Sequence, residues 1–120
     1  MQNKRKIGTK WELIAEEEII KKNYEILKKN YYSPYGEIDI IAKKEKMIIF
    51  VEVKYRKNKK YGYGEEAVTK TKQKRMYYTA MDYIMKKKLK NINFRFDIIA
   101  INNGKINWIK NSIWGDEIGL

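Results

Sequence analysis

The sequence contains, at residues 36–54, the stretch GEIDIIAKKEKMIIFVEVK, which decides the fold of the chain. Two apolar runs, residues 37–42 and 47–55, flank a short polar segment and predict an antiparallel hairpin. Each run carries charge in its middle, at Asp39 in the first and at Glu52 and Lys54 in the second. Because burying unpaired charge is costly, a chain that does so on two adjacent strands is expected to use these groups for a metal or for chemistry.

The length of the turn sets the pairing of these charges. If the hairpin turns tightly at residues 45–46, Ala42 pairs with Ile49 and Asp39 falls opposite Glu52. Two facing carboxylates repel each other, and a divalent cation between them would remove the repulsion.

Lys54 belongs to the same face as Glu52, because side chains alternate along a strand. It would stabilise the charge that develops on a phosphodiester during hydrolysis, or orient the attacking water. The alternative is a surface salt bridge on the solvated face of the hairpin. The apolar run at residues 48–51 favours a covered strand instead.

The amino-acid composition limits which catalytic groups, metal ions and binding partners the protein can use. The chain has 120 residues, enough for one domain, and lacks both cysteine and histidine, which excludes thiolate and histidine catalysis and zinc-thiolate sites. Carboxylates without these ligands favour a hard cation such as Mg²⁺ or Mn²⁺.

A net charge of +12 favours nucleic acid as a partner, although a lysine-rich compositional bias would give the same charge. No apolar run is long enough for a membrane span or a signal peptide, so we expect a cytoplasmic protein without membrane contact.

The remaining elements follow from periodicity and turn signals. Thr9 and Glu12 match a capping box at the start of a helix. Three strands before a long helix favour a mixed sheet with helices packed on it. The expected elements are a helix at 9–22, strands at 24–31, 37–42 and 47–55, a basic loop at 56–64, a helix at 65–89, and strands at 94–101 and 105–109.

Asp39 followed by Glu52-x-Lys54 resembles the D…(D/E)-x-K signature of the restriction-endonuclease-like PD-(D/E)XK nuclease superfamily. Residues 36–42 and 51–56 resemble the YraN-like family of small bacterial proteins more closely, as do Ala67-Val68…Lys72-Gln73 and the strand at 95–100. The resemblance spans residues 8 to about 110. It implies a restriction-endonuclease-like α/β/α core, similar to archaeal Holliday-junction resolvases, with a mixed five-stranded sheet, an N-terminal helix and a long central helix.

The resemblance also implies a site. Mg²⁺ or Mn²⁺ would lie between Asp39 and Glu52, with Lys54 as the catalytic lysine. A glutamate of the N-terminal helix would be near the metal; Glu12 matches it best, and Glu16 is the alternative one helical turn later. This chain has Trp11 where the family usually has a small residue.

Gln73 is a further catalytic candidate, because it lies four residues before Tyr77 on the apolar stripe of the long helix and related nucleases place a polar residue of this helix near the metal. An exposed end of the stripe is the alternative. Glu37 is expected beside Asp39, and Asp97 is expected to be structural. Basic residues that suit phosphate contacts, although some will form a solvated helix face, are Lys57, Lys59, Lys60, Lys70, Lys72, Lys74 and Arg75.

These observations predict a single nuclease-like domain over residues 1–120, with residues 110–120 as a short helix or a loose tail. The predicted function is metal-dependent hydrolysis of DNA, rather than RNA, with branched or single-stranded DNA as candidate substrates. The alternative is a nucleic-acid-binding protein of the same fold with little or no turnover. Junction resolvases of similar shape pair as dimers, which leaves a homodimer open.

Overall fold

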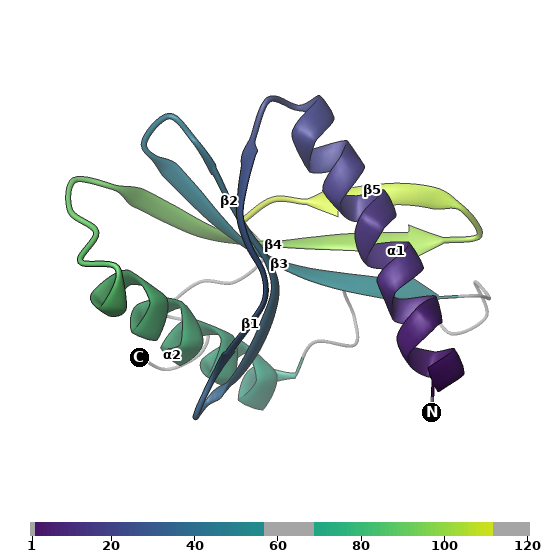
Figure 1. Cartoon of the computed structure of the whole chain (residues 1–120), viewed down its shortest axis with the longest axis horizontal. Helices are drawn as coiled ribbons and strands as arrows, with labels where there is room; N and C mark the ends of the chain where they lie inside the picture. The colour runs from purple at the N-terminus through teal and green to yellow at the C-terminus, as the bar shows by residue number, and fades with distance from the viewer. Residues whose placement is uncertain (1, 57–68, 112–120) are drawn as a thin grey trace.

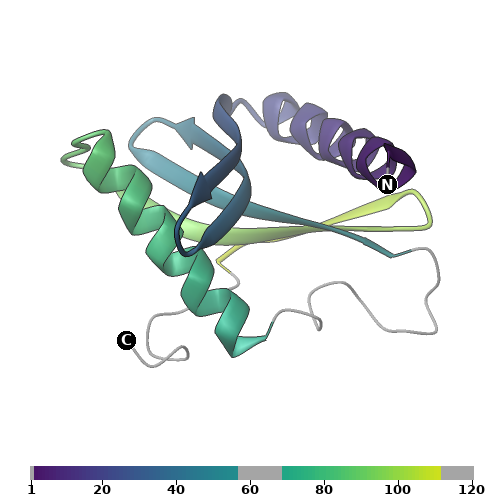
Figure 2. The same ribbon diagram turned by 60° about the horizontal axis from the view of Figure 1, so that its bottom comes forward.

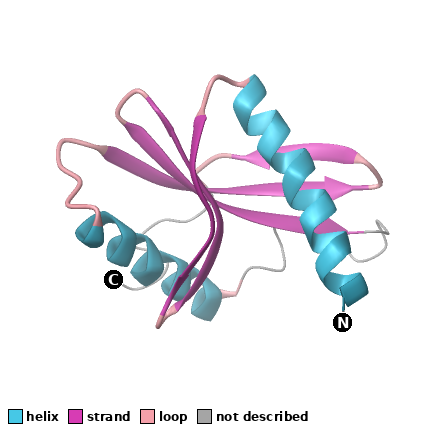
Figure 3. Ribbon diagram, in the orientation of Figure 1, coloured by secondary structure: helices cyan, strands magenta, loops and turns pink. Residues whose placement is uncertain are grey.

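The computed structural model describes residues 2–56 and 69–111. Its helices are α1 (Gln2–Lys21) and α2 (Lys70–Lys86), and its strands are β1 (Glu25–Ser33), β2 (Gly36–Lys44), β3 (Met47–Arg56), β4 (Asn93–Asn102) and β5 (Lys105–Ile109). The predicted order of one helix, three strands, one helix and two strands is confirmed (Figure 3). Within the described residues, neither helix has the length and apolar character needed to cross a membrane.

The strands form one mixed sheet in the order β1-β2-β3-β4-β5 (Figure 1). Strands β3 and β4 are parallel, whereas every other neighbouring pair is antiparallel. A parallel pair needs a crossover connection, and α2 lies between these two strands in the chain. Strand β3 is therefore central and is paired on both sides.

The two helices cover opposite faces of the sheet, which gives the expected α/β/α layers (Figure 2). Met76, Ala80 and Tyr83 of α2 pack against Ile48 and Phe50 on one face. On the other face, Ala15 and Ile19 of α1 pack into a separate cluster with apolar side chains of the strands, Ile40, Ile49, Val51 and Ile99. A strand covered on both faces reads as a continuous apolar run, which explains the sequence of β3.

The starts of the helices differ from the sequence-based expectation. Helix α1 begins at Gln2, so Thr9 lies inside the helix and the expected capping box is wrong. A capping side chain satisfies the free N–H groups of a first turn, and those groups are already bonded in a helix interior. Helix α2 begins at Lys70 and has Thr69 as its N-cap. The expected loop beyond residue 56, helical residues 65–68 and the tail from residue 112 lie outside the described residues.

Asp97 is a structural residue of β4, as expected. Its fully buried carboxylate accepts hydrogen bonds from Arg95 Nε at 2.9 Å, from Trp108 Nε1 at 2.9 Å and from the Asn111 N–H at 2.9 Å. The carboxylate thus ties β4 to β5 and to Asn111, two residues after β5, and it does not line the pocket described below.

Candidate functional site

The hairpin of β2 and β3 places the two predicted carboxylates where the strands separate. Ala42 pairs with Ile49, which confirms the predicted register. The last hydrogen-bonded pair of the two strands is Ile40 and Val51. Asp39 and Glu52, which are next to this pair, are therefore not the cross-strand pair we expected. Asp39 Oδ2 instead accepts a hydrogen bond of 2.8 Å from the backbone N–H of Val53.

The regular alternation of side chains along β2 breaks at Asp39. Ile38 and Ile41 both belong to the cluster under α2, although strict alternation would place them on opposite faces. Ile40, between them, belongs to the cluster under α1. The alternation of side chains between the two faces of the sheet is therefore interrupted at Asp39.

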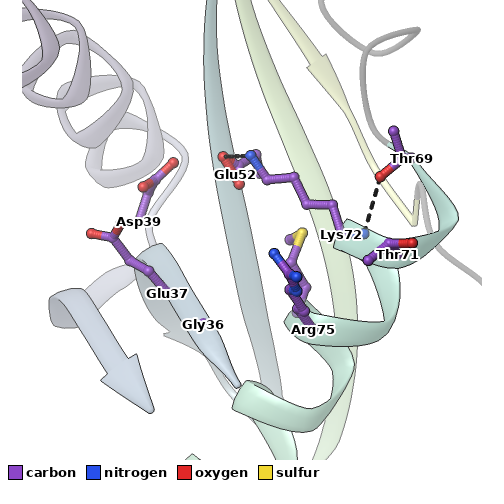
Figure 4. Close-up of a pocket in the computed structure, with 9 residues that line it drawn as sticks. Gly36, Glu37, Asp39, Glu52, Thr69, Thr71, Lys72 and Arg75 are labelled. Carbon is purple, nitrogen blue, oxygen red and sulfur yellow. Dashed lines mark hydrogen bonds and ion pairs between the residues drawn. The ribbon is translucent and has the colours of Figure 1, made fainter. Parts of the chain in front are cut away.

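Asp39 and Glu52 line one pocket of about 400 Å³, which opens between the separating strands and the start of α2. Figure 4 shows Glu37 and Asp39 on the β2 side of this pocket and Lys72 reaching from α2 to Glu52. The residues that line it are Gly36, Glu37, Asp39, Glu52, Thr69, Thr71, Lys72, Arg75 and Met76.

The carboxylates on the strand side repel one another. Burial, followed by the negative charge of Glu52, raises the pKa of Asp39 to about 8, and the Val53 N–H only partly offsets this. The charges of Glu12 and Glu37 raise it further. The pKa of Glu12 is also raised, first by burial and then by Glu37 and Glu52, against a hydrogen bond from Asn30 that lowers it. Several carboxylates thus gather around Asp39, and most of them are partly shielded from water.

Lys72 neutralises part of this charge from the other side. Its Nζ lies 3.1 Å from Glu52 Oε1, whose side chain is only 9% exposed. Burial lowers the pKa of Lys72, but the charge of Glu52, the hydrogen bond with Glu52 and the charge of Asp39 outweigh it, so the pKa is raised. Thr69 Oγ1 accepts a 3.1 Å bond from the Lys72 N–H and so fixes the helix start that carries this lysine.

The rotation of α2 explains why Lys72, and not Gln73, lines the pocket. The predicted stripe was Tyr77, Ala80, Met81 and Ile84, of which Ala80 is fully buried and the other three are half-buried. The buried residues of α2 are Met76, Thr79, Ala80 and Tyr83. One residue turns a helix by about 100°, so a face that starts one position earlier brings Lys72 into the place expected for Gln73. Gln73 is half-buried beside it.

Among the described residues, the other predicted basic side chains differ in how they lie relative to this pocket. Arg75 lines it, while Lys70 and Lys74 lie on the exposed side of α2. Lys54 is half-buried on β3, two residues after Glu52. Lys57, Lys59 and Lys60 lie outside the described residues.

Of the two glutamates predicted on α1, Glu12 is the one whose charge acts on Asp39. Glu16 forms an ion pair with Lys29 on β1, with Nζ and Oε2 3.4 Å apart. Trp11 stacks on Tyr55 of β3 with ring centroids 4.0 Å apart and planes 12° apart. This stack fixes the helix over the end of β3 and so positions Glu12.

Composition alone did not single out the two threonines of the pocket. Thr69 and Thr71 start α2, and the only signal for them was the Thr-x-Thr run before the basic stretch. Their contribution depends on where the helix begins.

The donor set fits a hard cation. The carboxylates of Asp39, Glu52 and Glu12 offer only oxygen atoms, which Mg²⁺ and Mn²⁺ prefer, and their mutual repulsion is the charge a cation would neutralise. In residues 2–56 and 69–111, no three acidic groups already stand close enough to hold a metal. The ammonium of Lys72 supplies the positive charge at Glu52 instead.

Comparison with known proteins shows a family whose members are similar to this chain over most of its length. Residues 11–101 match the family described as "Uncharacterised protein family UPF0102". A UPF0102 protein of Fusobacterium nucleatum is 47% identical over 98% of this chain and 99% of its own length. A UPF0102 protein of Vibrio parahaemolyticus is 40% identical over 92% of this chain and 94% of its own. A third, from Caldicellulosiruptor saccharolyticus, is 43% identical over 82% and 84% of the two chains.

Proposed function

We propose that this chain, which belongs to the UPF0102 family, is a cytoplasmic divalent-metal-dependent nuclease that hydrolyses phosphodiester bonds of DNA. The membership confirms the YraN-like resemblance of the sequence. One observation carries the proposal: Asp39 and Glu52 share a pocket whose opposite wall is formed by Lys72 and Arg75. Acidic oxygens on one side and cationic donors on the other are what a metal-assisted phosphoryl reaction requires.

Asp39 and Glu52 would hold Mg²⁺ or Mn²⁺, with Glu12 as a further ligand. When bound, the ion supplies a Lewis acid for the phosphoryl oxygen and lowers the pKa of a bound water. The residues of the chain do the rest. The Val53 N–H holds Asp39 Oδ2 in place, and the central position of β3 makes Glu52 the more rigid of the two carboxylates.

Cationic residues would act on the phosphate itself. Lys54 follows Glu52 by two residues, so strand alternation directs it to the same side, where its ammonium would stabilise the charge that develops on the phosphorus oxygens. Arg75 would bind a phosphate oxygen in the pocket, and Lys70 and Lys74 would contact the neighbouring phosphates of the strand. Gln73 would position a water or a phosphate beside Lys72.

A second candidate is a nucleic-acid-binding protein of the same fold that turns over little or no substrate. It is favoured by the ion pair of Lys72 with Glu52, which already balances the charge of one proposed metal ligand. In that case the basic residues of α2 would bind DNA while the carboxylates stabilise the fold.

Cleavage of labelled duplex, single-stranded, flap and four-way DNA in Mg²⁺ or Mn²⁺ separates the two candidates. A nuclease cuts at least one substrate, and Asp39→Asn and Glu52→Gln abolish cutting while they retain binding in EDTA. Mn²⁺ should also raise the melting temperature of the wild type and not of Asp39→Asn. Binding without any cutting by the wild type would establish the second candidate. A homodimer stays a prediction, which light scattering tests.

A further inference from the structure

Two tyrosines form an exposed aromatic pair beside the pocket. Tyr35, in the turn between β1 and β2, is 52% exposed, and Tyr78, on α2, is 41% exposed. Their ring centroids are 5.5 Å apart and their planes are inclined by 41°. Tyr77 supports Tyr78 from the helix, with centroids 5.9 Å apart. We call Tyr35 and Tyr78 the tyrosine pair.

The turn that carries Tyr35 is held firmly against α2. The Tyr35 N–H donates to Ser33 Oγ at 3.0 Å, and Ser33 Oγ lies 2.8 Å from the hydroxyl of Thr79, which is fully buried in α2. Gly36 packs on the helix at ordinary van der Waals distance, since a Cβ there would lie 3.5 Å from Arg75 Cβ. The tyrosine pair is therefore set in place by the fold, at low entropic cost to a ligand.

The tyrosine pair is continuous with the proposed catalytic pocket. Gly36 directly follows Tyr35 and lines the pocket, and Arg75 lines it three residues before Tyr78 (Figure 4). Lys74 lies exposed on the same helix. Exposed rings thus adjoin cationic side chains along one path that leads to Asp39 and Glu52.

This combination has the chemistry of single-strand recognition. Proteins that bind single-stranded nucleic acid combine a cationic track for the phosphates with aromatic rings on which unpaired bases stack. Bases in a duplex are already stacked and paired, so their faces are not available to a ring. A protein partner would also cover exposed tyrosines, but arginine and lysine at the edge of the pair favour a polyanion.

We propose that the tyrosine pair is a stacking platform for an unpaired base, so that the pocket receives single-stranded DNA or the single-stranded arm of a branched DNA. The proposal rests on the proposed function and names its substrate class. Arg75 and Lys74 bind the phosphates that flank the stacked base, and the strand continues from the tyrosine pair into the pocket.

The test measures binding in EDTA, where no hydrolysis occurs. The probes are a single-stranded oligonucleotide that carries one 2-aminopurine and a duplex of the same sequence. The test variant is Tyr35→Leu/Tyr78→Leu, and its matched control is Tyr35→Phe/Tyr78→Phe, which keeps both rings. Circular dichroism and thermal melting of each variant check the fold.

We expect the leucine variant to bind the single strand at least about fivefold more weakly, because the stacking of one base on an aromatic ring contributes at least that factor to the affinity. Its affinity for the duplex and the salt dependence of binding stay unchanged, because phosphate contacts are retained. Wild type and the phenylalanine variant quench the 2-aminopurine, whereas the leucine variant does not.

Equal single-strand affinity in the wild type and the leucine variant would overturn the proposal, as would an equal loss for single strand and duplex. Failure to bind any single strand would do the same. These outcomes are separate from those of the cleavage assay. If the wild type cuts DNA and the leucine variant cuts it equally, the nuclease stands without the platform. If stacking is found and no DNA is cut, the platform stands on a binding protein.

Discussion

The carboxylate of Asp39 bonds to the backbone N–H of Val53 at the point where β2 stops pairing with β3. The side chain takes the place of a main-chain partner there, so it completes the hydrogen bonding of the central strand. The same carboxylate is a proposed metal ligand. A structural role and a proposed chemical role therefore fall on one group, and different variants are needed to separate them.

Asp39→Asn and Asp39→Ala separate these roles. The asparagine keeps an oxygen that accepts from the Val53 N–H and loses only the charge, whereas alanine leaves the N–H without its acceptor. We expect Asp39→Ala to be about 1–3 kcal/mol less stable than Asp39→Asn in urea unfolding. Both variants should lose cleavage. Equal stability of the two would show that water replaces the carboxylate.

The raised pKa of Asp39 predicts a pH dependence of stability without divalent cations. Its pKa is raised from 3.8 to about 8 in the folded chain, so the folded state binds this proton more tightly than the unfolded state. The stabilisation is complete below pH 3.8, declines as the pH rises and is lost through pH 8. Urea unfolding in EDTA should show this decline in the wild type and a flatter profile in Asp39→Asn. Parallel profiles would contradict the assignment.

Lys72→Met should destabilise the protein and strengthen its response to Mn²⁺. The substitution removes the ammonium 3.1 Å from Glu52, whose side chain is 9% exposed. We expect a loss of about 1–2 kcal/mol, between that of exposed and of buried pairs. Because the competing cation is gone, Mn²⁺ should raise the melting temperature more than in the wild type. The matched control is Lys74→Met, on the exposed side of the same helix, which should change stability by less than about 0.5 kcal/mol.

Gly36→Ala should destabilise the fold and disturb the pocket. Gly36 has φ +155° and packs against Arg75, whereas Gly104, with φ +80°, has open space around it. Both substitutions strain the backbone, at a cost of about 1–3 kcal/mol. Only Gly36→Ala should also weaken DNA binding, measured by anisotropy, because it shifts the turn that carries Tyr35. Equal binding by both variants would remove the link between the turn and the site.

Local signals in the sequence were sufficient for the hairpin. Two apolar runs and a short polar turn fix which residue of β2 pairs with which residue of β3, and Ala42 does pair with Ile49. The separation of β2 from β3 at Asp39 was not predictable from the sequence, because it depends on how β2 packs against both helices. The capping box failed for a related reason: a local motif cannot tell whether the helix continues upstream of Thr9.

The ion pair of Lys72 and Glu52 joins elements whose relative placement no local pattern determines. The sequence indicated that α2 is amphipathic, but its predicted apolar face was shifted by one residue from the observed one. That shift placed Gln73 at the position where Lys72 lies. Only the packing of Met76 and Tyr83 against β2 and β3 settles that rotation. The sequence was therefore sufficient to predict that Asp39 and Glu52 lie near each other, but not that Lys72 pairs with Glu52.

The turn at Glu45 and Lys46, far along the hairpin from the pocket, has a consequence for variation among homologues. Its two residues connect Lys44 to Met47, which are themselves a pair, and so set the register of both strands. Adding or removing one residue there would send every later side chain of β3 to the opposite face and turn Glu52 towards α1. We therefore expect insertions and deletions to be rarer in this hairpin than in any surface loop of the chain.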